Sequence, residues 1–268
     1  MIRIFSILVG AFFSLALLNG FATGAYNQLT DPPAKPAEKV FGKHDKHLSL
    51  PSDGWFGKFD RQQLQRGYAV YANVCASCHS LKQVAFRDLE KLGYNEAEVK
   101  AIAAKATVNA KDPLTGEMKD RAGLPADKFP PVIYAGKGSP PDLSLITKAR
   151  HGGATYVYSL LTGYQDPPAN LPKESRPGEG LYFNPYFPNL NLSMAPPLTG
   201  EGQVTYSDGT KATVDQMAQD VSAFLVWTAE PELEQRHQTG FWWLGFLLFA
   251  TVLAYLSYRN IWAEKKGH

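Results

Sequence analysis

The chain has 268 residues, of which 44% are hydrophobic and 19% charged, and its formal net charge is +2. This balance excludes an intrinsically disordered protein, and the length allows one domain with a core and long loops. Residues 26–160 carry 19 basic and 14 acidic side chains, whereas residues 161–235 carry 3 and 10. The acidic second half could steer a basic partner or could be an ordinary solvated surface. We expect no nucleic-acid partner.

The N-terminal residues have the order of a secretory signal, which we place at residues 1–25. Arg3 precedes an apolar run over residues 4–18, and small residues follow. Because the cleavage motif that ends at Ala25 is imperfect, an uncleaved N-terminal anchor remains an alternative. Residues 26–58 are rich in Pro, Lys and Asp without a steady period, which predicts an extended lead-in. His44 and His47 lie there and are more often solvated than metal-binding.

The middle of the chain, residues 59–235, is predicted to be one mainly α domain with long irregular loops. Asp60 can cap a helix that ends at Asn73, and an amphipathic helix is expected over residues 214–228. The first helix presents Gly67 and Tyr71, and the second presents Phe224 and Trp227. Because glycine has no side chain, we expect the two helices to cross closely. The other expected elements are helices at 88–105, 140–149 and 155–161, loops at 111–131 and 166–197, and a hairpin at 201–211 with its turn at Asp208-Gly209.

The C-terminal part predicts one transmembrane helix, at residues 239–259. Residues 241–258 contain no charge and carry aromatic side chains suited to the membrane interfaces. Arg259, Lys265 and Lys266 follow, which places the tail, residues 260–268, in the cytoplasm. A buried core helix is the alternative. The preceding domain is then exported, on the periplasmic side of a cell inner membrane.

The only two cysteines form the motif Cys75-Ala76-Ser77-Cys78-His79. Two thiols three residues apart can reach the two vinyl groups of one haem, and the next residue presents an imidazole to its iron. This predicts one covalently bound haem c with His79 as a metal ligand. A redox dithiol would need a βαβ context, and a zinc site would need two more ligands, neither of which we find.

The residues leave several candidates for the second iron ligand. Met118 lies in a polar loop, and Met217 lies on the amphipathic helix, where methionine is usually core filling. Met194 precedes Ala195-Pro196-Pro197, and a loop stiffened by two prolines can hold a thioether with little entropy left to lose. Met194 could also be a core side chain, and His151 is the rival ligand.

Several longer motifs resemble cytochrome c1 of the cytochrome bc1 complex, closest to the mitochondrial and short alphaproteobacterial forms. They are Arg150-His151-Gly152-Gly153, residues 156–164, residues 180–188 and Met194-Ala195-Pro196-Pro197. The similarity covers most of residues 52–262. It implies a class I-like cytochrome c haem domain with one C-terminal transmembrane helix.

The resemblance also implies residue roles and partners. Met194 becomes the axial ligand, Arg150 and Tyr156 lie at the haem propionates, and Pro141 packs on the His79 side. The implied function is electron transfer within a quinol–cytochrome c reductase, without chemistry of the chain's own. Electrons would come from a Rieske iron–sulfur protein and go to a soluble or anchored c-type cytochrome, with cytochrome b as a further partner.

Two other functions stay open on the haem motif alone. One is an anchored haem sensor or ligand-binding domain with an open sixth site, which added carbon monoxide would reveal. The other is the haem subunit of a terminal oxidase or another reductase, which copurifying subunits would reveal.

Overall fold

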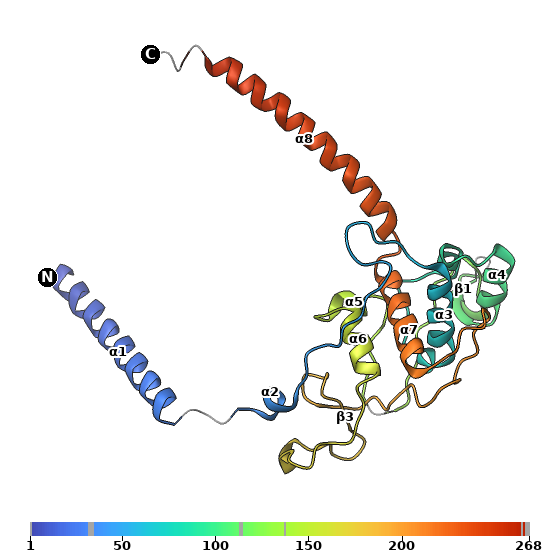
Figure 1. Ribbon diagram of the computed structural model, residues 1–268, viewed down its shortest axis with the longest axis horizontal. Helices are drawn as coiled ribbons and strands as arrows, with labels where there is room; N and C mark the ends of the chain where they lie inside the picture. The colour runs from blue at the N-terminus through green and yellow to red at the C-terminus, as the bar shows by residue number, and fades with distance from the viewer. Residues whose placement is uncertain (1, 32–34, 113–114, 137, 264, 266–268) are drawn as a thin grey trace. The chain divides into compact units, whose positions relative to one another are not determined.

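The computed structural model describes residues 2–31, 35–112, 115–136, 138–263 and 265, and the chain divides into two units, residues 1–42 and 43–268 (Figure 1). The first unit holds α1 (Ile2–Thr30) and the short α2 (Ala37–Phe41). The lead-in expected at 26–58 is therefore not extended throughout. α1 is long and apolar enough to cross a membrane, a test that a signal sequence also passes.

Two helices organise the second unit: α3 (Arg61–Asn73) and α7 (Val214–Ala229), which lie side by side (Figure 1). Their predicted close crossing is confirmed. A Cβ added to Gly67 would lie 2.1 Å from the carbonyl oxygen of Asp220 and 2.6 Å from Cβ of Phe224. Only a residue without a side chain permits this approach. α5 (Ile146–Ala149) and α6 (Ala154–Leu161) also contact α7.

The core lies between these helices and is rich in aromatic side chains. The rings of Tyr71 and Phe224 face each other across the α3–α7 contact at 5.8 Å, and Phe224 stacks on Trp227 at 5.7 Å. All three are at most 2% exposed. Burying each such ring contributes about 1.5–3 kcal/mol, so this cluster holds the two helices together.

A buried ion pair fixes the register of α3 against α7. Asp220 is fully buried and accepts from Nε of Arg66 at 3.0 Å and from Gln216 at 2.9 Å. The same guanidinium reaches Asp208 at 2.7 Å. A buried carboxylate needs such partners, because an unpaired one would cost several kcal/mol.

The remaining elements of the second unit are short, apart from its last helix. They are η1 (Cys75–Ser77), η2 (Phe86–Leu92), α4 (Glu96–Ala104), β1 (Thr107–Lys111), β2 (Met118–Ala122), η3 (Lys173–Ser175), β3 (Tyr182–Phe183), β4 (Asn191–Leu192) and α8 (Leu233–Ala263). β1 pairs antiparallel with β2, and β3 pairs antiparallel with β4. The mainly α fold class is thus as predicted, with small hairpins set in long loops.

Three local predictions were wrong. The helix expected at 88–105 is divided, because Gly93 adopts φ 97° and Asn95 starts α4 with a capping box to Glu98. No strands form at 201–211; the hairpin lies at β1–β2, in part of the segment expected to be loop. The helix expected at 140–149 begins only at Ile146, because Asp142 instead accepts the backbone N–H groups of Ser144 and Lys82.

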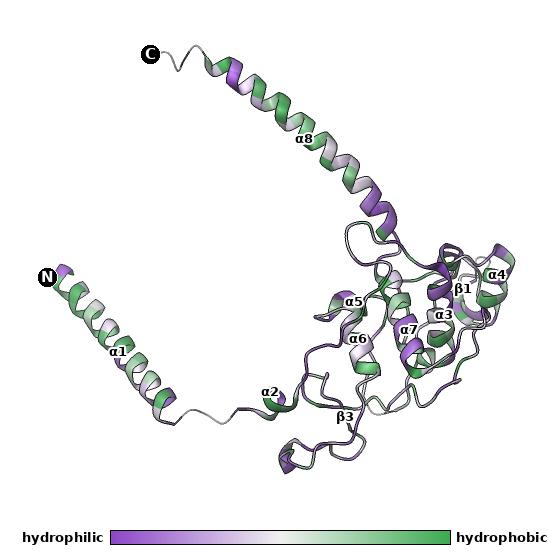
Figure 2. Ribbon diagram, in the orientation of Figure 1, coloured by the Kyte–Doolittle hydropathy of each residue, from purple (hydrophilic) through white to green (hydrophobic). Residues whose placement is uncertain are grey.

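α8 is one continuous helix that includes the expected transmembrane segment and the residues before it. It is long and apolar enough to span a membrane, and Figure 2 shows its hydrophobic stretch. A buried core helix would be covered by other elements, yet side chains in this stretch are exposed, as Trp242 (77%) and Leu248 (70%) illustrate. The finding favours the membrane helix over that alternative. The tail beyond Ala263 lies outside the described residues except for Lys265.

Candidate functional site

The cysteine motif is placed by the end of α3. Asp60 caps the start of this helix by accepting N–H groups of Gln62 and Gln63, at 2.9 and 3.3 Å. The helix ends at Asn73, and the 3₁₀ turn η1 follows at once. Because α3 is packed against α7 through Gly67, the position of this turn is fixed relative to the core.

The turn gathers the three residues of the motif that carry chemistry. The carbonyl of Cys75 accepts the N–H groups of Cys78 at 3.1 Å and of His79 at 2.9 Å. The hydroxyl of Tyr71, one turn earlier on α3, donates to the carbonyl of His79 at 2.9 Å. Both thiols are free, and the geometry presents them together with the imidazole on one turn of backbone.

The chemistry of this donor set argues against the two other uses of a CxxC pair. Burial, with a smaller effect of Cys78, raises the pKa of Cys75 to about 12, whereas redox dithiols depend on a lowered thiol pKa. Among the described residues, no group of three or more His, Cys, Asp or Glu side chains could hold a metal ion. A haem c site needs only the two thiols and the imidazole found here, together with a second iron ligand.

The ring of His79 is oriented by Pro141. Its Nδ1 lies 2.8 Å from the Pro141 carbonyl oxygen. Since a carbonyl only accepts, Nδ1 carries the proton and Nε2 keeps its lone pair for a metal. This is the arrangement common in metal-binding histidines, whose second nitrogen donates to a carbonyl or carboxylate. The predicted proximity of Pro141 to His79 is thus present, through the backbone.

Neighbouring hydrogen bonds hold these two segments together. The side chain of Asp142 accepts the N–H of Lys82 at 2.9 Å, and Ser144 accepts the N–H of Gln83 at 3.0 Å. The carbonyl of Ser80 accepts from Leu143 at 2.9 Å. The orientation of the imidazole therefore depends on a segment about sixty residues later in the chain.

Arg150 and Tyr156 form a second group. Gly152 and Gly153 turn the chain between them with φ of 82° and 54°, and α6 then begins at Ala154. Burial raises the pKa of Tyr156, and the positive charge of Arg150 partly opposes this shift, so the two side chains interact. Arg150 Nη1 also donates to the carbonyl of Ala149 at 3.0 Å. The guanidinium is exposed and could meet an anionic group.

Met194 lies just after β4 in a loop that is tied to α6. The hydroxyl of Tyr164 donates to the carbonyl of Met194 at 2.9 Å. The buried Asn184 donates to the carbonyl of Leu160 at 2.8 Å, which fixes the loop's base. Tyr164 also interacts electrostatically with Tyr156, so the second group and the methionine loop are neighbours.

Sequence reasoning assigned neither Tyr71 nor Tyr164 a contact with a predicted ligand residue. Both bind backbone carbonyls of predicted ligand residues, so their role is to hold those residues in place. Tyr164 lies inside one of the motifs shared with cytochrome c1, which was the available signal. His151, the rival ligand, influences Asp45 on the lead-in, whose pKa is raised by burial and lowered in part by the His151 and His44 charges.

Comparison with known proteins decides the family. A profile described as the Cytochrome C1 family matches residues 50–265. The chain belongs to the cytochrome c1 family. It is therefore a haem c protein of electron transport, with no catalysis of its own, as the motif and the resemblance predicted.

Curated relatives agree across most of the chain. It is 42% identical to "Cytochrome c1 1, heme protein, mitochondrial" of Arabidopsis thaliana over 263 residues, which cover 95% of this chain and 83% of the relative. It is 42% identical to "Cytochrome c1" of Rhodospirillum rubrum over 244 residues, 82% and 89% of the two chains. A Candida albicans relative named "Cytochrome b-c1 complex catalytic subunit, mitochondrial" is 40% identical and covers 84% and 77%.

Proposed function

We propose that this cytochrome c1 carries haem c on Cys75 and Cys78, with His79 and Met194 as the two iron ligands. The observation that carries the proposal is the Nδ1–Pro141 hydrogen bond, which leaves Nε2 of His79 as the coordinating atom. The thiols precede this imidazole on the same turn, the order in which a covalently attached haem meets its first ligand.

Met194 supplies the sulfur ligand in this proposal. Its loop is stiffened by Pro196 and Pro197 and is tied through its carbonyl to Tyr164. Met217 is fully buried on α7, where it fills the core, and Met118 lies on the exposed hairpin strand β2. Of the three, Met194 is the one whose carbonyl accepts the hydroxyl of Tyr164, which in turn interacts with Tyr156. A thioether ligand raises the reduction potential, which suits a carrier late in a chain.

Arg150 and Tyr156 are proposed to bind the haem propionates. An exposed guanidinium can donate charge-assisted hydrogen bonds to a carboxylate, and Tyr156 is held beside it at the start of α6. Neutralising a propionate in this way holds the haem edge and tunes its potential. Pro141 completes the set through its carbonyl on the His79 side.

The ligands can be tested by spectroscopy and mass spectrometry on the purified full-length chain. Haem should remain bound under denaturing conditions and should be lost in a Cys75→Ala, Cys78→Ala double variant. Met194→Leu should change the ferrous spectrum and lower the potential, because the sulfur donor is removed. Met118→Leu is the matched control, since Met118 is 60% exposed and should leave both unchanged. An unaltered Met194→Leu spectrum would refute the second ligand.

The proposed partners are those of a quinol–cytochrome c reductase, the bc1 complex. A relative from Bradyrhizobium diazoefficiens is named "Cytochrome b/c1", and the matched part is only 34% of that protein, which supports cytochrome b as a neighbour. The electron donor would be a Rieske iron–sulfur protein and the acceptor a soluble or anchored c-type cytochrome. Copurification with a haem b subunit and a Rieske subunit tests the assembly.

The acceptor is proposed to dock through the acidic second half of the haem domain, where residues 161–235 carry 10 acidic and 3 basic side chains. Charge steering of this kind raises the association rate and weakens with added salt. Stopped-flow electron transfer to a basic cytochrome should therefore slow as ionic strength rises. A rate that ignores salt would contradict electrostatic docking and leave the haem ligands unaffected.

The proposed topology has the haem domain, residues 59–235, on the periplasmic side of the inner membrane. It rests on the signal pattern at residues 1–25, the span at 239–259, and Arg259, Lys265 and Lys266 beyond it. The tail, residues 260–268, is then cytoplasmic. Protease treatment of intact spheroplasts should cleave the haem domain but spare a tag placed at the C-terminus. Mass spectrometry of the mature chain decides whether the signal is cleaved.

A further inference from the structure

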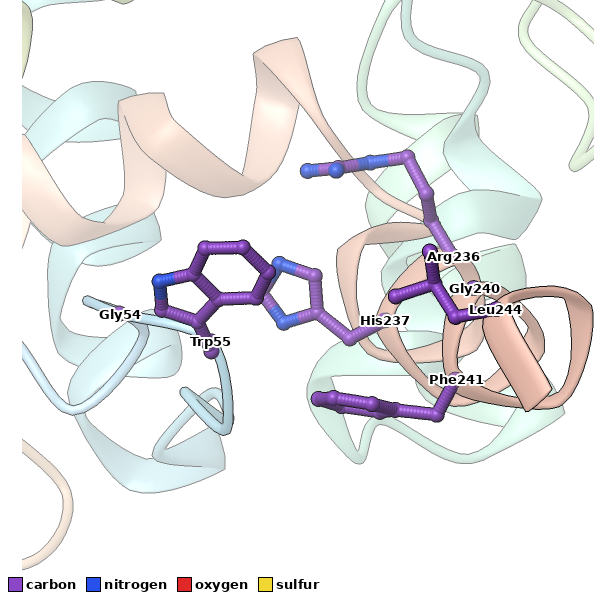
Figure 3. Close-up of a pocket in the computed structure, with 7 residues that line it drawn as sticks. All are labelled: Gly54, Trp55, Arg236, His237, Gly240, Phe241 and Leu244. Carbon is purple, nitrogen blue, oxygen red and sulfur yellow. The ribbon is translucent and has the colours of Figure 1, made fainter. Parts of the chain in front are cut away.

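A pocket of about 450 Å³ lies where the loop before α3 meets the first turns of α8 (Figure 3). Trp55 closes one side, and the helix contributes Arg236, His237, Phe241 and Leu244. These helix positions recur at the spacing of one helical face. None of these residues belongs to the haem site or was singled out by the sequence motifs.

The loop beside the pocket exposes two large aromatic side chains. Trp55 is 74% and Phe56 80% exposed. The Phe56 ring stacks on Phe241 of α8, with centroids 5.0 Å apart and an angle of 8°. Aromatic side chains of this kind gather where a membrane helix enters the headgroup region, which is where the charge-free stretch of α8 begins.

The charges around the pocket favour an anionic ligand. Glu230 pairs with Arg236 at 2.9 Å and with Lys148 at 3.0 Å, so this triad has a net charge of +1. The guanidinium of Arg236 is 58% exposed and keeps N–H groups free for another acceptor. Nδ1 of His237 is shielded from solvent and has no hydrogen-bond partner in the described part of the chain. A polar atom left in this state is costly unless a ligand pairs with it.

Polar and apolar positions follow one another along the helix in the order found in a phospholipid. Arg236 and His237 come first, and Phe241 and Leu244 follow, with about 12 Å of helix axis between Arg236 and Leu244. A phosphate at the first pair would therefore place its acyl chains beside the apolar residues. A free phosphate ion would use only the first pair and leave the apolar part of the pocket empty.

We propose that this pocket binds an anionic phospholipid, with its phosphate at Arg236 and His237 and its acyl chains along α8. Trp55 covers the glycerol region. The bound lipid ties the loop that precedes α3 to the membrane helix. The proposal depends on α8 crossing the membrane and is independent of the haem ligands.

The test uses the full-length, haem-loaded chain with any copurifying subunits, in nanodiscs of phosphatidylcholine. One set contains a photoactivatable phosphatidylglycerol and a second set contains the phosphatidylcholine with the same reactive group. After irradiation, mass spectrometry locates the labelled peptides. We expect the phosphatidylglycerol probe to label residues 54–58 and 236–244 more strongly than the phosphatidylcholine probe.

Variants then separate this site from general lipid contact. Arg236→Gln combined with His237→Gln should lower labelling by phosphatidylglycerol about tenfold, the effect of losing about 1.4 kcal/mol of binding. Glu230→Gln should increase labelling, because it makes the triad more positive. Arg259→Gln removes the same charge at the other end of α8 and should leave labelling of this site unchanged.

Three results would overturn the proposal. Equal labelling by the two probes would mean that the aromatic loop meets lipid without recognising its charge. Labelling that survives the double variant would assign the contact to residues outside the pocket. Peptides that remain unlabelled while a copurifying subunit protects them would show that a protein fills the pocket. The absorption spectrum of the haem should be the same in every variant, so these outcomes leave the ligand proposal untouched.

Discussion

The substitution Gly67→Ala tests the contact that positions the haem motif. The new Cβ would lie 2.1 Å from the Asp220 carbonyl oxygen and 2.6 Å from Cβ of Phe224. Neither atom can move by changing a rotamer, because one is backbone and the other is fixed to it. Reaching an ordinary contact of 3.4 Å requires α3 and α7 to separate by about 1.3 Å.

The expected loss of stability follows from two opposing effects. Overpacking a tight contact costs about 1–3 kcal/mol, and the rigid obstacles place this case at the upper end. Alanine recovers about 1 kcal/mol through its better helix propensity. We therefore expect the free energy of unfolding to fall by about 2 kcal/mol. The Tyr71–Phe224 contact across the same interface would loosen with it.

The assay is guanidinium denaturation of the full-length haem protein in detergent, followed by circular dichroism and by haem absorbance. Gly178→Ala is the control, because nothing lies within 4 Å of the added carbon. Its stability should change by no more than about 0.5 kcal/mol. If the two variants unfold at the same denaturant concentration, the close helix crossing is not what holds α3 in place.

Three further changes test other parts of the fold and site. Asp220→Ala should destabilise the protein by about 3 kcal/mol, because Arg66 loses its buried partner. Equilibrium unfolding measures this loss, and a value below about 1 kcal/mol would show that the Arg66–Asp220 ion pair does not hold α3 against α7. The Arg121 hydrogen bonds hold the pKa of Asp127 below 3.8, so the stability they add is present above that pH and is lost as pH falls through the lowered pKa. Asp127→Asn should therefore make stability fall less steeply at acidic pH. An unchanged pH dependence would show that the Arg121–Asp127 pair does not contribute to it. Tyr164→Phe should weaken the sulfur–iron bond that we propose for Met194 and lower the reduction potential, since the methionine loop loses a hydrogen bond worth about 1 kcal/mol. Redox titration measures the potential, and an unchanged value would show that this hydrogen bond does not position the loop.

The sequence correctly predicted the elements that depend on a local pattern, and the helix contact that depends on a position with no room for a side chain. The Asp60 cap and the apolar period of α7 are local signals, and both helices lie where expected. Gly67 signals close approach because no other residue could occupy that position. The cysteine motif is local as well, since it consists of the short 3₁₀ helix η1 and the next two residues, Cys78 and His79.

Two of the wrong predictions arise from pairing or hydrogen bonding with another segment of the chain, and the third overlooked a local signal. β1 and β2 have little apolar alternation, and their pairing depends on a partner strand across a turn. Gly93 could have been recognised as a helix end, because Asn95 and Glu98 form a capping box just after it. The helix predicted at 140–149 starts late, because the carboxylate of Asp142 accepts the backbone N–H of the distant Lys82.

The candidate site depends both on residues that are adjacent in sequence and on contacts between distant segments. Cys75, Cys78 and His79 are adjacent in sequence, so the motif alone identifies them, whereas the orientation of the imidazole depends on Pro141, 62 residues later. The same holds for Met194, whose carbonyl is bound by Tyr164 from 30 residues earlier. The residue types therefore specify which atoms could bind iron. The tertiary structure orients the two proposed ligands, the imidazole of His79 and the loop of Met194. For this reason, substitutions that move α3 against α7 should disturb the site as strongly as substitutions beside its ligands.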